Sequence, residues 1–326
     1  MARRSDPPAC GGATVMTMQS RIWRAAGVMT VGTALSRVTG LLRVAAMTYA
    51  LGVTGTRLAD TYNLANTTPN IVYELFLGGI FTSVFVPVLI EARQRKTGDE
   101  SALVSVSLVA LALVSALTAI GAPFIMRIYT FRIADPTTRA AQLELASQLL
   151  RWFAPQIFFY GAAAIAQALL NVRGRFGPAS FAPVLNNLIV TATFVYYGRA
   201  VAEQGLALTS TAKIVLGAGT TAGVIVQAIV LVPLLRGERL RLRIAPSDPA
   251  VAKTLRLAAY VIGYVVSNQI VLWVVLALAN GEQGGVTAWN LAYWFFQLPH
   301  GLFAVSLYTA LFPDLSRAAD RRDWTS

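Results

Sequence analysis

The chain has 326 residues, of which 56% are hydrophobic and only 13% are charged. A soluble domain usually carries about 25% charged residues, so this composition excludes an ordinary soluble protein. Basic residues outnumber acidic ones by 27 to 15, which gives a net charge of +12.

Apolar stretches of about 20 residues or more, the length a helix needs to cross a bilayer, recur along the chain. They are continuous apolar tracts without the alternation of membrane β-strands. We therefore predict an all-α polytopic membrane protein. The eight predicted transmembrane helices cover residues 27–52, 62–90, 101–128, 146–170, 178–198, 208–235, 256–280 and 285–313.

Basic residues gather in alternate loops between these helices. Short cytoplasmic loops collect Lys and Arg, so we expect an inner-membrane protein with both termini of this chain in the cytoplasm. Because the charge is spread over one membrane face, it favours anionic membrane lipids as partners and argues against nucleic acid. The basic set is Arg3, Arg4, Arg21, Arg24, Arg93, Arg95, Lys96, Arg173, Arg175, Arg236, Arg239, Arg241, Arg243, Lys253, Arg256, Arg317, Arg321 and Arg322; the opposite loops hold Arg57, Arg127, Arg132, Arg139 and Arg199.

Reactive residue types are scarce. Cys10 is the only cysteine and His300 the only histidine, so neither an intrachain disulfide nor a Cys- or His-rich metal site is expected. The sequence also lacks a nucleotide-binding Gly-x-x-x-x-Gly-Lys-Ser/Thr run and a hydrolytic Ser, His and Asp set. We expect a protein that is not an enzyme and that needs no cofactor.

The sequence contains a weak internal repeat. Residues 62–65 read Tyr-Asn-Leu-Ala, residues 289–292 read Trp-Asn-Leu-Ala, and residues 81–85 match 308–312 at the same offset of 227. A repeat of six helices would place both copies in the same orientation, about an axis along the membrane normal. Chance similarity between two lipid-facing helices is the alternative.

The repeat suggests a division of the chain. We expect a disordered tail over residues 1–20, a first six-helix lobe over 21–240, and the first two helices of an incomplete second lobe over 241–326.

Two arginines lie far inside the first predicted helix. Arg37 and Arg43 are about 15 and 24 Å along its axis at a rise of ~1.5 Å per residue, and a central Arg costs ~2.5 to 3.5 kcal/mol on insertion scales. Both should therefore face a polar cavity, where forked guanidinium hydrogen bonds suit phosphate groups. A structural ion pair, with Glu74 as the obvious partner near mid-membrane, is the alternative.

Other candidates surround this pair. Ser36 and Gly40 share a face with Arg43 and should permit close helix approach. Asp60 is a second candidate binding residue, although it could simply be an N-cap. Glu74 is the third.

Several residues are candidates for a hinge or for tight packing. Pro69 and Pro299 fall inside predicted helices, where proline should kink or break the helix. Gly78 and Gly79 add a second flexible point to the second predicted helix.

These residues form an ordered pattern that resembles the MurJ (MviN) family of lipid II flippases, within the MOP exporter superfamily. The resemblance extends from about residue 20 to 320. It rests on Ser36–Arg43, Leu51-Gly52, Asp60, Pro69-Asn70, Phe85–Leu89, Leu170-Asn171, Arg175-Phe176, Pro178, Phe181–Asn187, Pro299, Gly301 and Leu311–Ser316.

The resemblance implies a flippase that moves the peptidoglycan precursor lipid II, or a related anionic polyprenyl-diphosphate lipid, across the membrane by alternating access. Arg37 and Arg43 match functional arginines of the family's first helix, and Asp60 matches a conserved acid. This chain departs from the pattern in three places. Tyr73 and Glu74 replace basic residues, Val44 replaces an Asp, and Trp294 replaces an Arg.

The family fold implies two six-helix lobes and two extra helices, so this chain corresponds to its N-terminal portion. Two alternatives remain open. A drug or oligosaccharide-lipid exporter of the same superfamily would carry cation-binding acids in its cavity. A non-transporting scaffold or inactive fragment in cell-wall assembly would tolerate replacement of Arg37 and Arg43. Cell-wall synthesis proteins are further candidate partners.

Overall fold

The computed structural model describes residues 11–74, 85–95, 99–237, 243, 245 and 249–299. Every regular element in these ranges is helical, so the all-α prediction is confirmed there. In chain order the elements are α1 (Gly11–Leu51), α2 (Leu58–Glu74), α3 (Val86–Arg95), α4 (Asp99–Thr130), α5 (Pro136–Phe153), α6 (Pro155–Val172), α7 (Phe176–Tyr196), η2 (Tyr197–Val201), α8 (Ser210–Ile229), η3 (Val232–Leu235), α9 (Pro249–Ala279) and α10 (Gly285–Pro299).

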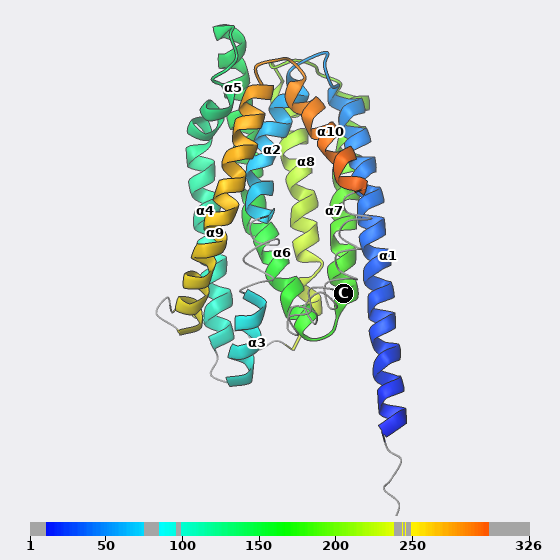
Figure 1. Ribbon diagram of the computed structural model, residues 1–326. Helices are drawn as coiled ribbons and strands as arrows, with labels where there is room; N and C mark the ends of the chain where they lie inside the picture. Colours follow the sequence, from blue (N-terminus) through cyan, green and yellow to red (C-terminus); the bar gives the residue numbers. More distant parts are fainter. Residues whose placement is uncertain are drawn as a thin grey trace, which may run out of the picture.

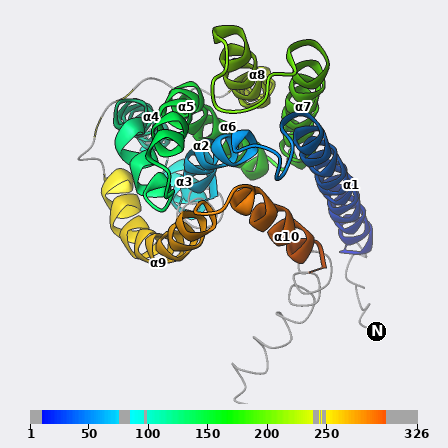
Figure 2. The ribbon, with the colours of Figure 1, turned by 90° about the horizontal axis from the view of Figure 1, so that it is seen from above.

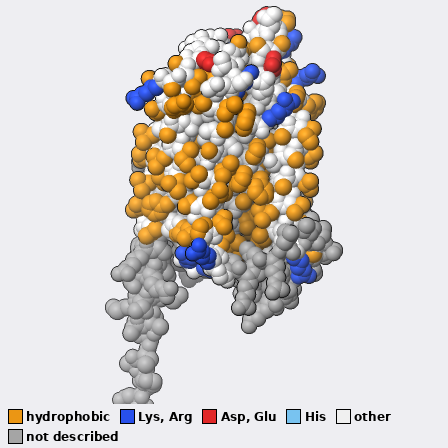
Figure 3. Space-filling model, turned by 180° about the vertical axis from the view of Figure 1, so that it is seen from behind, with side chains coloured by type: hydrophobic (Ala, Val, Ile, Leu, Met, Phe, Trp, Pro, Cys, Tyr) orange, Lys and Arg blue, Asp and Glu red, His pale blue; other side chains and the backbone are white. Residues whose placement is uncertain are grey.

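The helix bundle has the surface of a membrane protein. Four stretches, 100–130, 136–172, 177–201 and 210–235, are long and apolar enough to cross a bilayer, and 265–279 is a shorter apolar stretch. Hydrophobic side chains form a broad middle band, and Lys and Arg lie above and below it (Figure 3). The chain is therefore a polytopic membrane protein, as predicted.

Several helix boundaries differ from the predicted ones, and two of the differences have a local explanation. The fourth predicted helix, 146–170, is observed as α5 and α6, which together cover 136–172. Helix α5 begins early because the Asp135 carboxylate caps it, accepting from the Thr138 amide at 2.7 Å, and Pro136 occupies the first turn. Polar residues such as Arg139 suggested a loop, whereas they belong to a helix.

The first helix also starts earlier than expected. We expected a disordered tail over residues 1–20, but α1 is already helical from Gly11. Adding residues to an existing helix costs far less than nucleating a new one, so a long apolar helix can extend into a polar flank.

Helix α1 packs along α7 over much of its length, and both lie at one side of the bundle (Figures 1 and 2). A Cβ on Gly32 would come within 2.5 Å of the Ser180 Cβ, so only glycine permits this approach. Further along, the Asn187 side chain of α7 donates to the Ser36 carbonyl oxygen of α1 at 3.0 Å. The α1–α7 pair forms one wall of the site described below.

Helix α9 lies beside α4, on the side of the bundle away from α1 (Figure 2). The Trp273 indole donates to the Ile128 carbonyl oxygen at 3.1 Å, and the Asn280 amide donates to that of Tyr129 at 3.0 Å. At the other end of α9, Lys253 pairs with Glu91 of α3. Helix α9 is thus fastened to the preceding helices at both ends.

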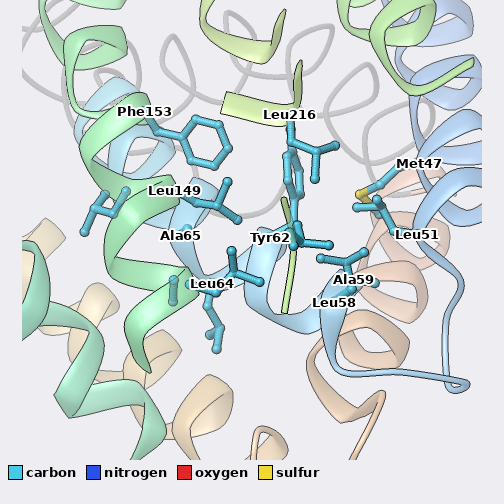
Figure 4. Close-up of a cluster of buried hydrophobic side chains, with 14 of the residues drawn as sticks. Met47, Leu51, Leu58, Ala59, Tyr62, Leu64, Ala65, Leu149, Phe153 and Leu216 are labelled. Atoms are coloured by element: carbon cyan, nitrogen blue, oxygen red, sulfur yellow. The ribbon is translucent and has the colours of Figure 1, made fainter. Parts of the chain in front are cut away.

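The apolar core gathers around the start of α2 (Figure 4). Tyr62 is buried and meets Phe153 and Phe194 edge-on, with ring centroids 5.3 and 5.2 Å apart. Leu51 and Leu58 on either side of the α1–α2 turn are fully buried in the same cluster. This packed cluster fills the end of the bundle next to that turn.

Candidate substrate cavity

Helices α1, α2, α6, α7, α8, α9 and α10 enclose a cavity of about 760 Å³. A cavity of this size is typical of small-molecule sites. Its lining contains both predicted arginines, seven asparagines and three glutamines. Among the described lining residues there is no Asp, Glu or Lys, so the cavity is cationic and rich in neutral hydrogen-bonding groups.

We predicted that Arg37 and Arg43 face a polar cavity, and both line this one. Arg37 is exposed and Arg43 is half-buried. Within the described part of the chain, neither guanidinium has a hydrogen-bond or ion-pair partner, so their ten donors in total are available. Arg43 is near enough to Tyr62 and Tyr160 for its charge to act on both hydroxyls.

Ser36 and Gly40 line the cavity on the same face of α1 as Arg43. The Ser36 carbonyl oxygen accepts from Asn187, and a Cβ on Gly40 would lie 3.7 Å from the same amide nitrogen, which is ordinary contact. The close approach of α1 to α7 is made instead at Gly32, which the sequence analysis did not single out.

Two buried side-chain amides of the cavity lining come from α7 and α8. Asn186 and Gln227 line the cavity and are 5% and 1% exposed. Both polar atoms of the Gln227 side chain and the Asn186 Oδ1 have no hydrogen-bond partner within the described part of the chain. Buried amides of this kind need water or a ligand to satisfy them.

Asp60 does not line the cavity. It is fully buried in the first turn of α2 and accepts from the Gly284 amide at 2.6 Å and the Thr287 amide at 2.9 Å. The Thr287 hydroxyl donates to it as well, at 2.7 Å. Asp60 therefore satisfies free backbone amides, as the capping alternative suggested, but they belong to α10 and not to its own helix.

Arg57, one turn before Asp60, makes the complementary contact with the end of α9. Its guanidinium donates to the carbonyl oxygens of Asn280 and Gly281 at 2.9 and 3.1 Å. A cation suits the negative end of a helix, as an anion suits the positive end. We call Arg57 and Asp60 together the α2 clamp, because they hold the whole α9–α10 turn.

Sequence reasoning missed Arg57, which we counted only among the loop charges. The one available signal was its spacing of three residues from Asp60, which places both side chains on one face of a helix. Their target could not be identified, because the α9–α10 turn lies more than 220 residues further along the chain.

Comparison with known proteins decides the family. The model of a family described as lipid II flippase MurJ matches residues 47–326. The chain belongs to this family. A probable lipid II flippase MurJ of Haemophilus influenzae is 30% identical over 308 residues, covering 90% of this chain and 58% of the relative. A lipid II flippase MurJ of Burkholderia cenocepacia is 28% identical and covers 90% and 57%.

The solved structure of a lipid II flippase MurJ in an inward closed conformation has the same fold. It superimposes with a TM-score of 0.71 at 22% identity, covering 90% of this chain and 59% of that chain. The chain thus spans less than two thirds of the length of these MurJ proteins.

The departures from the MurJ pattern affect the same cavity. Val44 and Trp294, two of the positions at which the sequence was interpreted as departing from that pattern, both line it. Arg37 and Arg43 are consequently the only charged residues among its described lining.

The remaining predicted residues divide into two groups. Helix α2 continues past Pro69 as far as Glu74, so this proline does not end the helix. The Glu74 side chain, Gly78, Gly79 and His300 lie outside the described residues, and α10 is described up to Pro299.

Proposed function

We propose that this chain forms the substrate-entry half of a flippase that moves lipid II across the membrane during cell-wall synthesis. The observation that carries the proposal is the pair of guanidiniums, Arg37 and Arg43, which have no partner among the described residues and lie in a cavity whose described lining contains no carboxylate. MurJ relatives in two organisms are named as lipid II flippases, which gives the substrate class.

The chemistry of the lining suits the head group of such a lipid. Arg43 and Arg37 present planar donor forks that match the oxygens of a diphosphate. The charge of the phosphates offsets the cost of keeping two arginines within membrane depth. Transport without chemical change needs only that the cavity bind and release this group, so no catalytic residue is required.

The layout that we propose has eight transmembrane helices, six in a first lobe over residues 21–240 and two at the start of a second lobe. Contacts between α2 and α10 support a parallel repeat, because residues about 224 to 227 apart meet at the α2 clamp. The two lobes would then rock about the cavity.

The orientation follows from the loop charges. Arg173 and Arg175 donate to carbonyl oxygens of Arg236 and Leu234, so two of the basic loops lie together at one end. The α2 clamp lies at the other end. By the positive-inside rule we expect the basic end to face the cytoplasm of an inner-membrane protein, with both termini of this chain predicted on the same side.

The test is complementation of a flippase-depleted bacterium by the full-length gene, with lipid II quantified in the outer leaflet. We expect Arg37→Ala and Arg43→Ala to abolish rescue at matched membrane levels. Arg139→Ala, which removes an exposed arginine of α5 outside the cavity, is the control and should rescue fully.

Two outcomes would contradict the proposal. Rescue by both cavity variants would favour a scaffold that does not transport. Failure of the wild-type gene, with export of another lipid or drug, would favour an exporter of the superfamily.

A further inference from the structure

We propose that Asn186, Gln227 and Tyr160 form a neutral subsite for the N-acetylated sugar next to the diphosphate of the transported lipid. This inference rests on the proposed function and adds the part of the head group that the arginines do not recognise. It is carried by the unpartnered amides of the cavity wall.

Gln227 is held in place by the packing of its own helix. Thr220, Gly223 and Gln227 recur at helical spacing along one face of α8. The Thr220 hydroxyl on this face shares a hydrogen bond of 2.9 Å with the Tyr62 hydroxyl. Gly223 lies against the Asn186 side chain. Gln227 comes one turn later, is 1% exposed, and lines the cavity with both polar atoms unpaired.

Asn186 and Tyr160 complete the group. Tyr160 and Asn186 line the cavity together, and the Asn186 Oδ1 has no hydrogen-bond partner among the described residues. The three side chains therefore offer an unpaired acceptor on Asn186, and both a donor and an acceptor on Gln227. An acetamido group and sugar hydroxyls have the same mixture of donors and acceptors.

The position of the subsite relative to the arginines identifies the sugar. Arg43, Tyr160 and Asn186 line the same cavity, so the subsite shares it with the guanidinium that we assign to the diphosphate. The group directly attached to the diphosphate in this class of lipid is a sugar. A peptide stem carries carboxylates, for which a wall of uncharged amides is a poor match.

Gln227 has no hydrogen-bond partner among the described residues, so its role in binding can be tested separately from folding. Replacing Gln227 by Leu breaks no hydrogen bond within the described chain, so it should leave stability unchanged or increase it. A purely structural glutamine would behave in the opposite way.

The experiment measures binding of three lipids to the purified full chain in nanodiscs: undecaprenyl diphosphate, its glucose derivative and its N-acetylglucosamine derivative. We expect the wild type to bind the N-acetylglucosamine lipid about tenfold more tightly than the bare diphosphate, the effect of one or two neutral hydrogen bonds. Gln227→Leu and Asn186→Leu should remove this preference and leave binding of the bare diphosphate unchanged.

Controls separate the possible failures. Gln167→Leu changes a half-buried glutamine of α6 whose Nε2 also has no hydrogen-bond partner among the described residues but which does not line the cavity, and it should keep the preference. Gln227→Met serves if the Leu variant does not fold. Retained preference in both cavity variants, or a wild type that binds all three lipids equally, overturns the subsite alone. A wild type that binds none of them overturns the proposed function as well.

Discussion

The Asp60 carboxylate of α2 accepts hydrogen bonds from the backbone amide and the hydroxyl of Thr287 on α10, at 2.9 and 2.7 Å. The two residues are 227 positions apart, which is the offset of the internal sequence repeat. Residues at equivalent positions of two repeats can touch only beside the axis that relates them. The contact is therefore the one that a repeat about such an axis requires.

We expect Asp60→Ala to destabilise the protein by about 2 kcal/mol, because buried hydrogen bonds to a charged group contribute roughly 1.5 to 3 kcal/mol and the amides of α10 would lose their acceptor. Thermal unfolding in detergent would measure the change. Asp135→Ala removes an exposed cap of α5 and should lower the stability less than Asp60→Ala does. Equal effects of the two substitutions would contradict a special role of the clamp.

Gly284→Ala should be more damaging than Gly205→Ala, although both glycines have a positive φ, of +81° and +95°. A Cβ on Gly284 would lie 2.8 Å from the Val53 carbonyl oxygen and 2.9 Å from the Thr54 Cα, whereas Gly205 has open space. Backbone atoms cannot move aside easily, so the α9–α10 turn would have to withdraw from the α1–α2 turn. Crosslinking between cysteines placed at Thr54 and Gln283 would report that separation, and an unchanged yield would contradict it.

Arg43→Lys should bind undecaprenyl diphosphate about tenfold more weakly than the wild type, and Arg43→Ala should bind it more weakly still. Lysine keeps the charge and loses the planar fork that contacts two phosphate oxygens. Binding at low and high salt would separate the two effects. Full binding by the Lys variant would show that only charge matters at this position.

Glu203 should contribute stability that depends on pH. Its carboxylate accepts from the Thr209 hydroxyl and amide, and these hydrogen bonds lower the pKa of Glu203. Because the folded-state pKa is below the unfolded one, the contribution is complete above the ordinary Glu range near ~4.3 and is lost as pH falls below it. Glu203→Gln should thus lower the Tm at pH 7 and have a smaller effect at pH 3. A constant difference between the two pH values would show that ionisation of Glu203 is not involved.

The fold was largely predictable because membrane helices are selected by length and apolarity. The apolar tract of α4 was placed within a few residues of its observed bounds, Asp99–Thr130. Helix α5 was cut short by ten residues, since its amphipathic first half resembles a loop when only hydropathy is considered. The signal that corrects this, Asp135 before Pro136, is a local cap.

The candidate site was predictable only in part. Arg37 and Arg43 stood out because charge is costly at membrane depth. Gln227 and Asn186 did not, because a neutral amide in a helix costs little and occurs often. Their importance depends on which hydrogen bonds they lack, and that property exists only in three dimensions.

If the chain takes part in transport as proposed, the attachment of α9 at both ends has a consequence for its speed. Lys253 and Glu91 form an exposed pair, which water and salt weaken readily. In the α2 clamp, Asp60 is fully buried and Arg57 is half-buried, so its contacts are better shielded from both. If the second lobe moves during transport, the exposed pair can break and re-form at small cost. Opening of the α2 clamp would then be the slower of the two steps. Turnover would then respond to substitutions at Asp60 far more than to ionic strength, and a weakened clamp would make a less stable protein that cycles faster.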